Sequence, residues 1–397
     1  METNPRIEIA DIFSKHKERL GNLPKEQWKV VQDIINCRTA ALGGHVLECD
    51  NCGHLENRYN SCRNRHCPKC QFATKTKWLE DRKKELLPVS YFHLVFTLPA
   101  ELNTIILQNK RVCYNILFKS ASKTLKEVAL NQKNLGAHVG FFMVLHTWGQ
   151  NLMNHPHIHA VVPGGGISPD NDSWIGCKKN YLLPVAILSK VFRGKYLSQL
   201  EKAFKKGKLE FHGNIKELKE EEEFKEVLKK SSKHSWVVYA KKPFAGPEQV
   251  LGYLGNYTHR IAISNHRIIK VENDNVYFRI RDSGDESKKK IMALDVGEFM
   301  RRFLLHVLPA RFMKIRHYGF LGNKYKKRNI ELCREFIGRQ AGHSLKESSS
   351  SDVADNKKES AEELIKRLFD IDIFQCKNCK KGRMVMVGEI KRFDSTG

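Results

Sequence analysis

Two histidines separated by a single residue are the first feature of this sequence that could perform chemistry. In the stretch "HPHIHAVVPGGG" at 155–166, His157 and His159 lie on either side of one isoleucine. If this stretch is a β-strand, both imidazoles point to the same face of the sheet, because residues two apart share a face. Two neutral imidazoles directed at one point can bind a metal ion, exchange a proton or form a polar strip. The pair alone leaves a zinc hydrolase, a structural metal site and a nuclease metal site open.

Two tyrosines downstream suggest which reaction the histidine pair could support. "YLGNY" places Tyr253 and Tyr257 four positions apart, on one face of an expected helix. Such a pair is ordinarily part of a core, but the flanking sequence "THRIAISNHR" is polar and basic. A phenol is a poor nucleophile at neutral pH because its pKa is about 10. A metal ion that polarises a phosphodiester makes the phosphorus easier to attack. A metal site and a tyrosine are together what DNA strand transfer through a phosphotyrosine requires.

Cysteine pairs near the N-terminus have the spacing of a zinc site. Cys49 and Cys52 form one Cys-x-x-Cys pair, and Cys67 and Cys70 form another. Each pair can close a tight turn on one metal ion, and four tetrahedral thiolates are the usual closed structural zinc site. We therefore predict one zinc site from these four residues. Further candidates for its fourth ligand are Cys62, His45, His54 and His66.

A third cysteine pair lies near the C-terminus, in "CKNCKKGRM". Cys376 and Cys379 form half of a zinc site, and the sequence around them offers no second pair. Cys333 or His343 could complete it, but the spacing assigns neither.

The composition indicates a polyanionic partner. The chain has 397 residues, of which 41% are hydrophobic, and a net charge of +25. This apolar fraction excludes disorder throughout, and the length suggests two or three domains. So large a positive charge points to nucleic acid.

No feature of the sequence indicates export or a membrane. The opening stretch "METNPRIEIADIFSKHKERL" contains no apolar signal-peptide core, and no segment is apolar for long enough to span a bilayer. Eleven cysteines without an export signal are better explained as thiols or metal ligands than as disulfides. We expect a cytoplasmic, DNA-associated protein with no membrane partner.

The elements that must position these residues alternate between strand and helix patterns. Runs at 138–148 and 157–163 predict a hairpin with the histidine pair on its second strand. A buried strand is predicted at 91–99 and a long amphipathic helix at 101–130. The remaining predictions are helices within 1–45, a solvated helical insertion at 202–234, a strand at 236–240, a helix from Pro247 through the tyrosines, a hairpin at 266–282 with its turn at "ENDN", helix and loop at 291–322, and a flexible linker beyond 340.

Four segments, in order behind the cysteine cluster, resemble a known family. They are "FTLP", "LHTWGQNLMNHPHIHAVVPGGG", "YLGNYTHRIAISNHR" and "RRFLLHVLPARFMKIRHYGFLGN". In combination, and over residues 10–325, the chain resembles the two-tyrosine HUH transposases of rolling-circle insertion sequences, the insertion sequence ninety-one family. The resemblance implies an α+β fold in which an HUH endonuclease core, an antiparallel sheet with flanking helices, follows a small zinc-ribbon-like domain. The implied domains are a helical and zinc-binding DNA-contact domain at 1–90, a catalytic domain at 91–325 and a flexible basic tail with a cysteine pair at 326–397.

The resemblance also implies roles for single residues. His157 and His159 match the metal-binding histidine pair, and Tyr253 and Tyr257 match the two nucleophilic tyrosines. The predicted zinc ligands match the family's zinc-binding domain; they are Cys49, Cys52, Cys67 and Cys70.

The third ligand of the catalytic metal is not fixed by the resemblance. His146 and Gln150 are the candidates, because each lies on the neighbouring strand or at its turn, where it could face the pair, and of the two we favour His146. His155 is expected to orient the loop or to contact phosphate. The cofactors implied are Mg²⁺ or Mn²⁺ at the histidines, with Mn²⁺ better suited to imidazole, and Zn²⁺ at the cysteines.

The activity implied is cleavage and rejoining of single-stranded DNA at transposon ends through a 5′-phosphotyrosine, during rolling-circle transposition. Single-stranded or hairpin DNA is the expected partner. The sequence contains no Gly-x-x-x-x-Gly-Lys-Ser/Thr motif, so unwinding of a duplex is expected to come from elsewhere.

Two other functions fit parts of the sequence. A replication initiator or conjugative relaxase would share the HUH chemistry, although the cysteine cluster and "RHYGFLGN" favour the transposase. A zinc-containing DNA-binding regulator without catalysis fits the composition, charge and cysteines equally well. The regulator does not explain a histidine pair followed by paired tyrosines.

Overall fold

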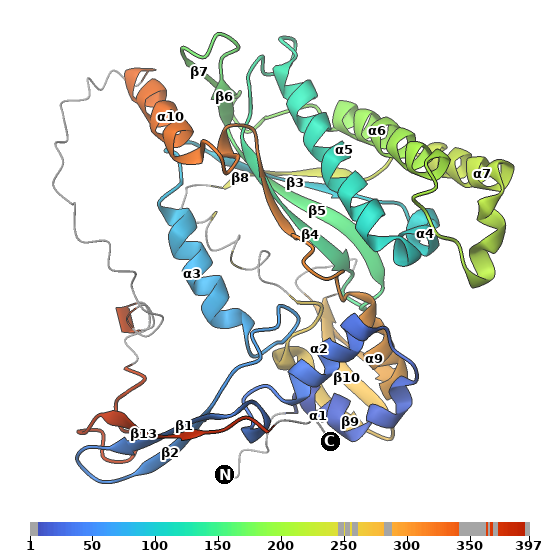
Figure 1. Cartoon of the computed structure of the whole chain (residues 1–397). Coiled ribbons are helices and arrows are strands. Elements are labelled where there is room, and N and C mark those ends of the chain that lie inside the picture. The colour runs from blue at the N-terminus through green and yellow to red at the C-terminus, as the bar shows by residue number, and fades with distance from the viewer. Residues whose placement is uncertain are drawn as a thin grey trace. The chain divides into compact units, whose positions relative to one another are not determined.

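The aromatic and β-branched runs of the sequence form one five-stranded antiparallel sheet in the computed structural model (Figure 1). Its strands are β3 (Tyr91–Thr97), β4 (Phe141–Trp148), β5 (Asn154–Pro163), β8 (Val238–Phe244) and β12 (Ile315–Tyr318). They lie in the order β12-β4-β5-β3-β8, and β4 and β5 form the predicted hairpin. The four strands predicted for this region are therefore confirmed, whereas β12 was not predicted.

The structure describes residues 7–244, 250, 255, 261–281, 288–340, 363, 366–367 and 372–393. The chain divides into two units. Unit 1 consists of Met1–Glu80, His259–Val307 and Ser349–Gly397, and unit 2 of Asp81–Thr258 and Leu308–Ser348. The expected domains follow one another along the chain, whereas unit 1 combines three separate segments.

Helices cover one face of the sheet in unit 2 (Figure 1). They are α4 (Asn103–Gln108), α5 (Lys110–Leu130), α6 (Val185–Lys205) and α7 (Glu221–Ser232). The helix predicted at 101–130 is interrupted at Asn109. The side chain of Asn109 accepts a hydrogen bond from the N–H of Glu210 at 2.7 Å and donates one to the Glu210 carbonyl at 2.8 Å.

Helix α6 begins well before the charged insertion predicted at 202–234. Apolar residues recur every four positions along it and are fully buried; they are Leu188, Phe192, Tyr196 and Leu200. This period places them in one stripe that packs into the core. The insertion is not wholly solvated either, because Phe224 of α7 is fully buried and stacks on Phe204, with ring centroids 4.2 Å apart.

Alternation along the strands separates the hydrophobic core from the histidines. Ile158 of β5 lies in the core beneath the helices, so His157 and His159 on either side of it lie on the opposite face. In β4, Leu145 belongs to the same core, and His146 next to it therefore faces the same way as the histidine pair. The sheet thus presents an apolar face to the helices and a face that bears histidines.

A smaller core in unit 2 includes a helix from the region expected to be a flexible tail. It joins β6 (Gly165–Ile167) and β7 (Trp174–Gly176) to α10 (Lys326–Gln340), which buries Ile330, Cys333 and Phe336. The 3-10 helix Gly319–Leu321 starts at Gly319, whose φ is +60° and where a Cβ would overlap the carbonyl oxygen of Val139. The expectation of a tail beginning at 326 is wrong for these residues.

Unit 1 contains a three-stranded sheet to which the C-terminus returns. β1 (Gly44–Cys49) pairs antiparallel with β2 (Leu55–Tyr59) on one side and with β13 (Met384–Ile390) on the other. Residues 384–390 were also expected to be part of the flexible tail. Their sequence, "MVMVGEI", is strand-like, and the structure corrects that expectation.

A second sheet in unit 1 packs against the helix that follows it, with the ring centroids of Phe278 and Phe299 5.7 Å apart. It consists of β9 (Ile268–Glu272), β10 (Asn275–Arg281) and β11 (Lys289–Asp295), followed by α9 (Val296–Leu305). The predicted hairpin is confirmed, and its turn residues Asn273 and Asp274 have φ of +48° and +56°. β11 lies where helix or loop was predicted. Among the described residues, the other helices are α1 (Ile9–Lys15), α2 (Lys25–Ile35) and α3 (Gln71–Lys83), with 3-10 helices at Lys17–Leu20, Ala40–Leu42, Ala100–Leu102, Gly213–Lys219 and Asn265–Arg267.

Among the described residues, no helix combines the length and the apolar character that crossing a membrane requires.

Candidate metal and catalytic centres

Three histidines of the sheet in unit 2 converge on one point. His146 of β4 is directly opposite His157 of β5, and Val144 is opposite His159. One ring nitrogen from each of the three histidines lies within 4.8 Å of the others. The ring centroids of His146 and His159 are 4.5 Å apart, and those of His157 and His159 are 4.8 Å apart. Strand alternation and register are therefore sufficient to assemble three imidazoles on one face.

Hydrogen bonds orient two of these rings. Nδ1 of His157 donates to the carbonyl oxygen of His155 at 2.6 Å. Nδ1 of His159 lies 2.7 Å from Nε2 of His93, a residue of the adjacent strand β3. With Nδ1 engaged in these bonds, Nε2 is the nitrogen through which either ring would bind a metal ion.

His93 of this centre was not predicted from the sequence, and neither was Cys37 of the first cysteine group described below. The side chain of His93 is buried, and that burial, together with the positive charge of Lys241 and His157, lowers its pKa to about 3. His93 is therefore neutral at pH 7 and can accept a hydrogen bond from Nδ1–H of His159. The only available signal was a histidine within the apolar strand sequence "YFHLVF".

His146, the favoured third ligand, lies close to His157 and His159, whereas the two tyrosines predicted as nucleophiles lie outside the described residues. His146 is buried and belongs to the three-histidine group, whereas Gln150 lies in the turn that connects β4 to β5. Tyr253 and Tyr257 lie outside the described residues. Ligation by the three histidines and attack by the tyrosines remain predictions.

The cysteines form two groups rather than one. In the first group, Sγ of Cys70 lies 3.4 Å from Sγ of Cys37 and 3.5 Å from Sγ of Cys62. Cys67 completes this group. Hydrogen bonds from Cys62 and Cys67 lower the pKa of Cys37 to about 7, which favours the thiolate that binds metal.

The second group joins the two ends of the chain. Sγ of Cys49 lies 3.7 Å from Sγ of Cys379, and Sγ of Cys52 lies 3.8 Å from Sγ of Cys376. Hydrogen bonds from the N–H groups of Gly382 and Lys381 lower the pKa of Cys379 to about 6. Burial raises the pKa of Cys49 to about 11.

The prediction of a single zinc site from Cys49, Cys52, Cys67 and Cys70 is therefore corrected. The reason is the β1–β2 hairpin. Cys49 and Cys52 lie at its turn, whereas Cys67 and Cys70 follow its open end. A five-residue strand extends roughly 17 Å at about 3.3 Å per residue, so the two pairs cannot share one ion.

The spare ligand candidates separate in the same way. Cys62 joins the first group, while His45, His54 and His66 belong to none of the three groups found among the described residues. Cys333, considered as a partner of the C-terminal cysteine pair, is instead buried in the smaller core of unit 2, to which α10 contributes. His343 lies outside the described residues.

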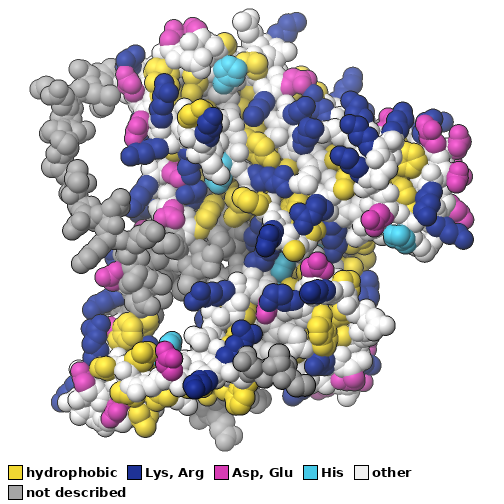
Figure 2. All heavy atoms as spheres, in the orientation of Figure 1, with side chains coloured by type: hydrophobic (Ala, Val, Ile, Leu, Met, Phe, Trp, Pro, Cys, Tyr) yellow, Lys and Arg dark blue, Asp and Glu magenta, His cyan; other side chains and the backbone are white. Residues whose placement is uncertain are grey.

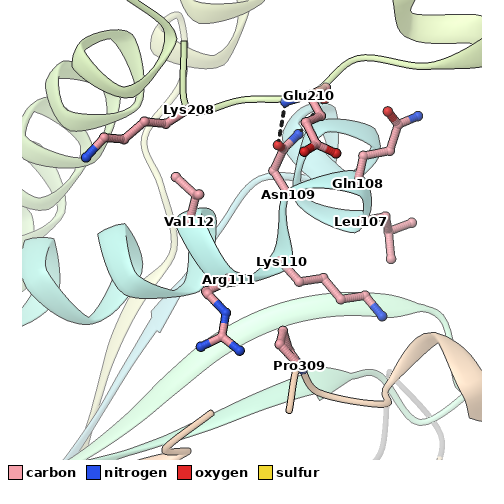
Figure 3. A pocket seen from close by; sticks show the side chains of 9 residues that line it. All are labelled: Leu107, Gln108, Asn109, Lys110, Arg111, Val112, Lys208, Glu210 and Pro309. Atoms are coloured by element: carbon pink, nitrogen blue, oxygen red, sulfur yellow. Dashed lines mark hydrogen bonds between the residues drawn. The ribbon is translucent and has the colours of Figure 1, made fainter. Parts of the chain in front are cut away.

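A basic groove lies apart from the histidines, on the helical layer of unit 2. A cavity of about 300 Å³ is lined by Lys110 and Arg111 at the start of α5 and by Lys208 (Figure 3). A neighbouring cavity of about 360 Å³ shares Lys208 and adds further lysines of α5 and α6, namely Lys119, Lys202 and Lys206. These six cationic residues define the basic groove, and Figure 2 shows Lys and Arg side chains gathered over the same helices. None of the three histidines lines either cavity.

Two segments of the chain match models of known protein families. Residues 8–98 match a transposase zinc-binding domain, and residues 140–329 match a family described as putative transposase. The putative transposase y4qJ of Sinorhizobium fredii is 47% identical over 384 residues, which are 96% of this chain and 94% of that protein. The chain belongs to the insertion sequence ninety-one family of transposases.

A second relative supports the same assignment. The transposase for insertion sequence element IS801 of Pseudomonas savastanoi is 26% identical over 320 residues, 77% of this chain and 72% of that protein. No solved structure matches this transposase. The predicted family and the predicted α+β fold are confirmed, and membership favours the transposase over a replication initiator and over a regulator without catalysis.

Proposed function

We propose that this transposase cleaves and rejoins single-stranded DNA at transposon ends through a 5′-phosphotyrosine. The observation that supports this most directly is the convergence of His146, His157 and His159, within 4.8 Å of one another, on the face of the sheet opposite its hydrophobic core. In a chain of this family, three converging imidazoles, together with two tyrosines at the expected spacing in the sequence, suit metal-assisted attack on a phosphodiester.

The covalent step exchanges one phosphodiester for another. The phenolic oxygen of Tyr253 or Tyr257 attacks the phosphorus and loses its proton, and an O–P bond forms. The bond from phosphorus to the 3′ oxygen breaks, and that oxygen takes up a proton to give a free 3′-OH. The 5′ phosphate stays on the tyrosine, so rejoining by attack of a 3′-OH needs no ATP. Two tyrosines permit a second cleavage before the first adduct is resolved.

The three histidines fit a divalent cation. A bound Mn²⁺ or Mg²⁺ would polarise the scissile phosphate and stabilise the charge that develops on the leaving oxygen. Three imidazoles suit Mn²⁺ better than Mg²⁺, which prefers oxygen ligands. His93 and the His155 carbonyl hold two of the rings in one orientation.

The first cysteine group fits a structural zinc ion. Its four cysteines lie within residues 8–98, which match the transposase zinc-binding domain. Four thiolates without an open position favour a structural role over a catalytic one. We assign DNA contact to the basic residues around this group and to the basic groove, where lysine and arginine side chains can neutralise phosphates.

Covalent capture tests the proposed function. A labelled single-stranded oligonucleotide that spans a transposon end is incubated with the full-length protein and Mn²⁺, and adducts that survive detergent are separated by electrophoresis. We expect an adduct that persists in at least one of Tyr253→Phe and Tyr257→Phe and is lost in the double variant. Loss in His157→Ala is also expected, whereas Tyr181→Phe, an exposed tyrosine of unit 2, serves as the matched control and keeps the adduct.

Three results would contradict the proposal. An adduct that survives in the double tyrosine variant would place the nucleophile elsewhere. DNA binding without an adduct on any end sequence would support a DNA-binding protein without catalysis. Cleavage of a replication origin in preference to a transposon end would indicate an initiator.

A further inference from the structure

We propose that the second cysteine group binds its own zinc ion and so fastens the C-terminal segment 372–393 to the N-terminal hairpin of unit 1. The segments matched by the two family models, 8–98 and 140–329, do not include Cys376 and Cys379. This site is independent of the proposed strand transfer.

The distances fit one tetrahedral ion. With zinc–sulfur bonds of about 2.3 Å, the sulfur atoms of a tetrahedral site lie about 3.8 Å apart. The sulfur pairs Cys49–Cys379 and Cys52–Cys376 are 3.7 Å and 3.8 Å apart. Each of these pairs takes one cysteine from either end of the chain, so a single ion would bind both ends.

The two ends supply matching turns. Gly53 directly follows Cys52 and has a φ of +67°, and Lys380 directly follows Cys379 and has a φ of +58°. The N–H of Gly53 donates to the carbonyl of Cys49 at 3.0 Å, and the N–H of Lys380 donates to that of Cys376 at 2.9 Å. Both Cys-x-x-Cys segments therefore adopt the same tight turn, the kind that directs two thiolates at one metal.

Polar groups around the sulfur atoms complete a thiolate site. Asn51, within the first turn, donates to Sγ of Cys379 at 3.6 Å, and Asn378, within the second, donates to Sγ of Cys52 at 3.8 Å. The N–H of Gly382 donates to Sγ of Cys379 at 3.3 Å, and a Cβ at Gly382 would overlap Sγ of Cys49. Such hydrogen bonds stabilise metal-bound thiolates and orient them.

Apart from its pairing with β1, the C-terminal strand buries little apolar surface. The buried hydrophobic cluster at this site contains four residues, and two of them are cysteines of the group: Leu47, Cys49, Cys376 and Met384. Val385, Met386 and Val387 of β13 are each about half exposed. Since a small sheet with so little buried apolar surface is marginal in water, metal binding would supply most of the stability of this sheet.

Zinc content measured on purified full-length variants tests the proposal. The double variants Cys49→Ser/Cys52→Ser and Cys376→Ser/Cys379→Ser are each expected to hold one zinc per chain fewer than the wild type. The quadruple variant is expected to lose no more than either double variant, because both pairs share one ion. Cys177→Ser is the matched control, since Cys177 belongs to none of the cysteine groups, and it should keep the wild-type content.

Limited proteolysis gives a second measurement that does not depend on the variants folding. Zinc chelation from the wild-type protein should increase trypsin cleavage at Lys380, Lys381 and Arg383 about tenfold or more, and added Zn²⁺ should restore protection. A wild-type zinc content in Cys376→Ser/Cys379→Ser, or a quadruple variant that loses two ions, would overturn the proposal. A disulfide found between the two ends in the untreated protein would also overturn it. Adduct formation plays no part in these measurements, so the failure of either proposal is seen separately.

Discussion

His93 contacts the three-histidine site through His159. It is buried in β3, and its Nε2 lies 2.7 Å from Nδ1 of His159. A hydrogen bond of this kind fixes the tautomer and the rotation of a metal-binding ring, and its loss typically lowers metal affinity or activity about 10–100-fold. His93 is thus a positioning residue for His159.

Replacing His93 by residues of different hydrogen-bonding capacity measures this effect. In His93→Phe, we expect the Mn²⁺ concentration that gives half-maximal adduct formation to rise about 10–100-fold. His93→Gln should recover part of that loss, because an amide can accept the hydrogen bond from Nδ1–H. A metal titration of adduct formation gives the comparison, with His212→Phe, an exposed histidine, as control. An unchanged metal requirement in a stably folded His93→Phe variant would show that His159 does not depend on this contact.

Residues of the three-histidine site could be predicted from the sequence where they lie close together in the chain. His157 and His159 follow from period-two alternation, and His146 from its place on the neighbouring strand. His93 could not be predicted in this way, because its contact with His159 spans 66 positions and depends on the order of the strands in the sheet. The same limit explains the cysteines, where the partner of Cys52 lies 324 positions away.

At the scale of elements, patterns with a clear period were predicted well and long-range pairing was not. The apolar strands β3 and β5 and the charged helix α7 appear at the expected places. β12 and β13 were missed because each joins a sheet whose other strands are distant in sequence. The residues of such an edge strand do not identify its partner or its register, which come from the rest of the fold.

Helix α7 provides a test of aromatic anchoring. Phe224 is fully buried and stacks on Phe204 with an angle of 10° between the rings. Phe224→Ala should lower the local stability of the insertion by about 3–5 kcal/mol, because the transfer and cavity costs add. Hydrogen exchange should then show faster exchange across residues 221–232. The histidines lie on the other face of the sheet, so we expect adduct formation to persist.

The control for this prediction is on the same helix. Lys225 is exposed and pairs with Glu221, a surface contact that contributes little to stability. Lys225→Ala should leave exchange across α7 near the wild-type rate. Equal exchange in Phe224→Ala and Lys225→Ala would mean that the aromatic stack does not anchor the insertion.

At the scale of the whole molecule, the net charge of +25 can act on DNA in two ways. It can attract a polyanion from a distance, or particular side chains can neutralise particular phosphates. Only contacts of the second kind depend on where each charge lies. The basic groove of α5 and α6 concentrates six cationic residues and a single acidic one, Glu210, among those that line it.

The salt dependence of binding to single-stranded DNA distinguishes attraction by the net charge from contacts between particular side chains and phosphates. For single strands, the logarithm of the binding constant falls with the logarithm of salt concentration by about 0.7 for each phosphate neutralised. Lys206→Gln/Lys208→Gln, in the basic groove, should therefore reduce the slope by about 1.4. Lys229→Gln/Lys230→Gln removes the same charge from α7, outside the lining of either cavity, and should change the slope much less. If both double variants reduce the slope equally, net charge rather than the groove governs binding, and the phosphate path must be sought on another surface of the transposase.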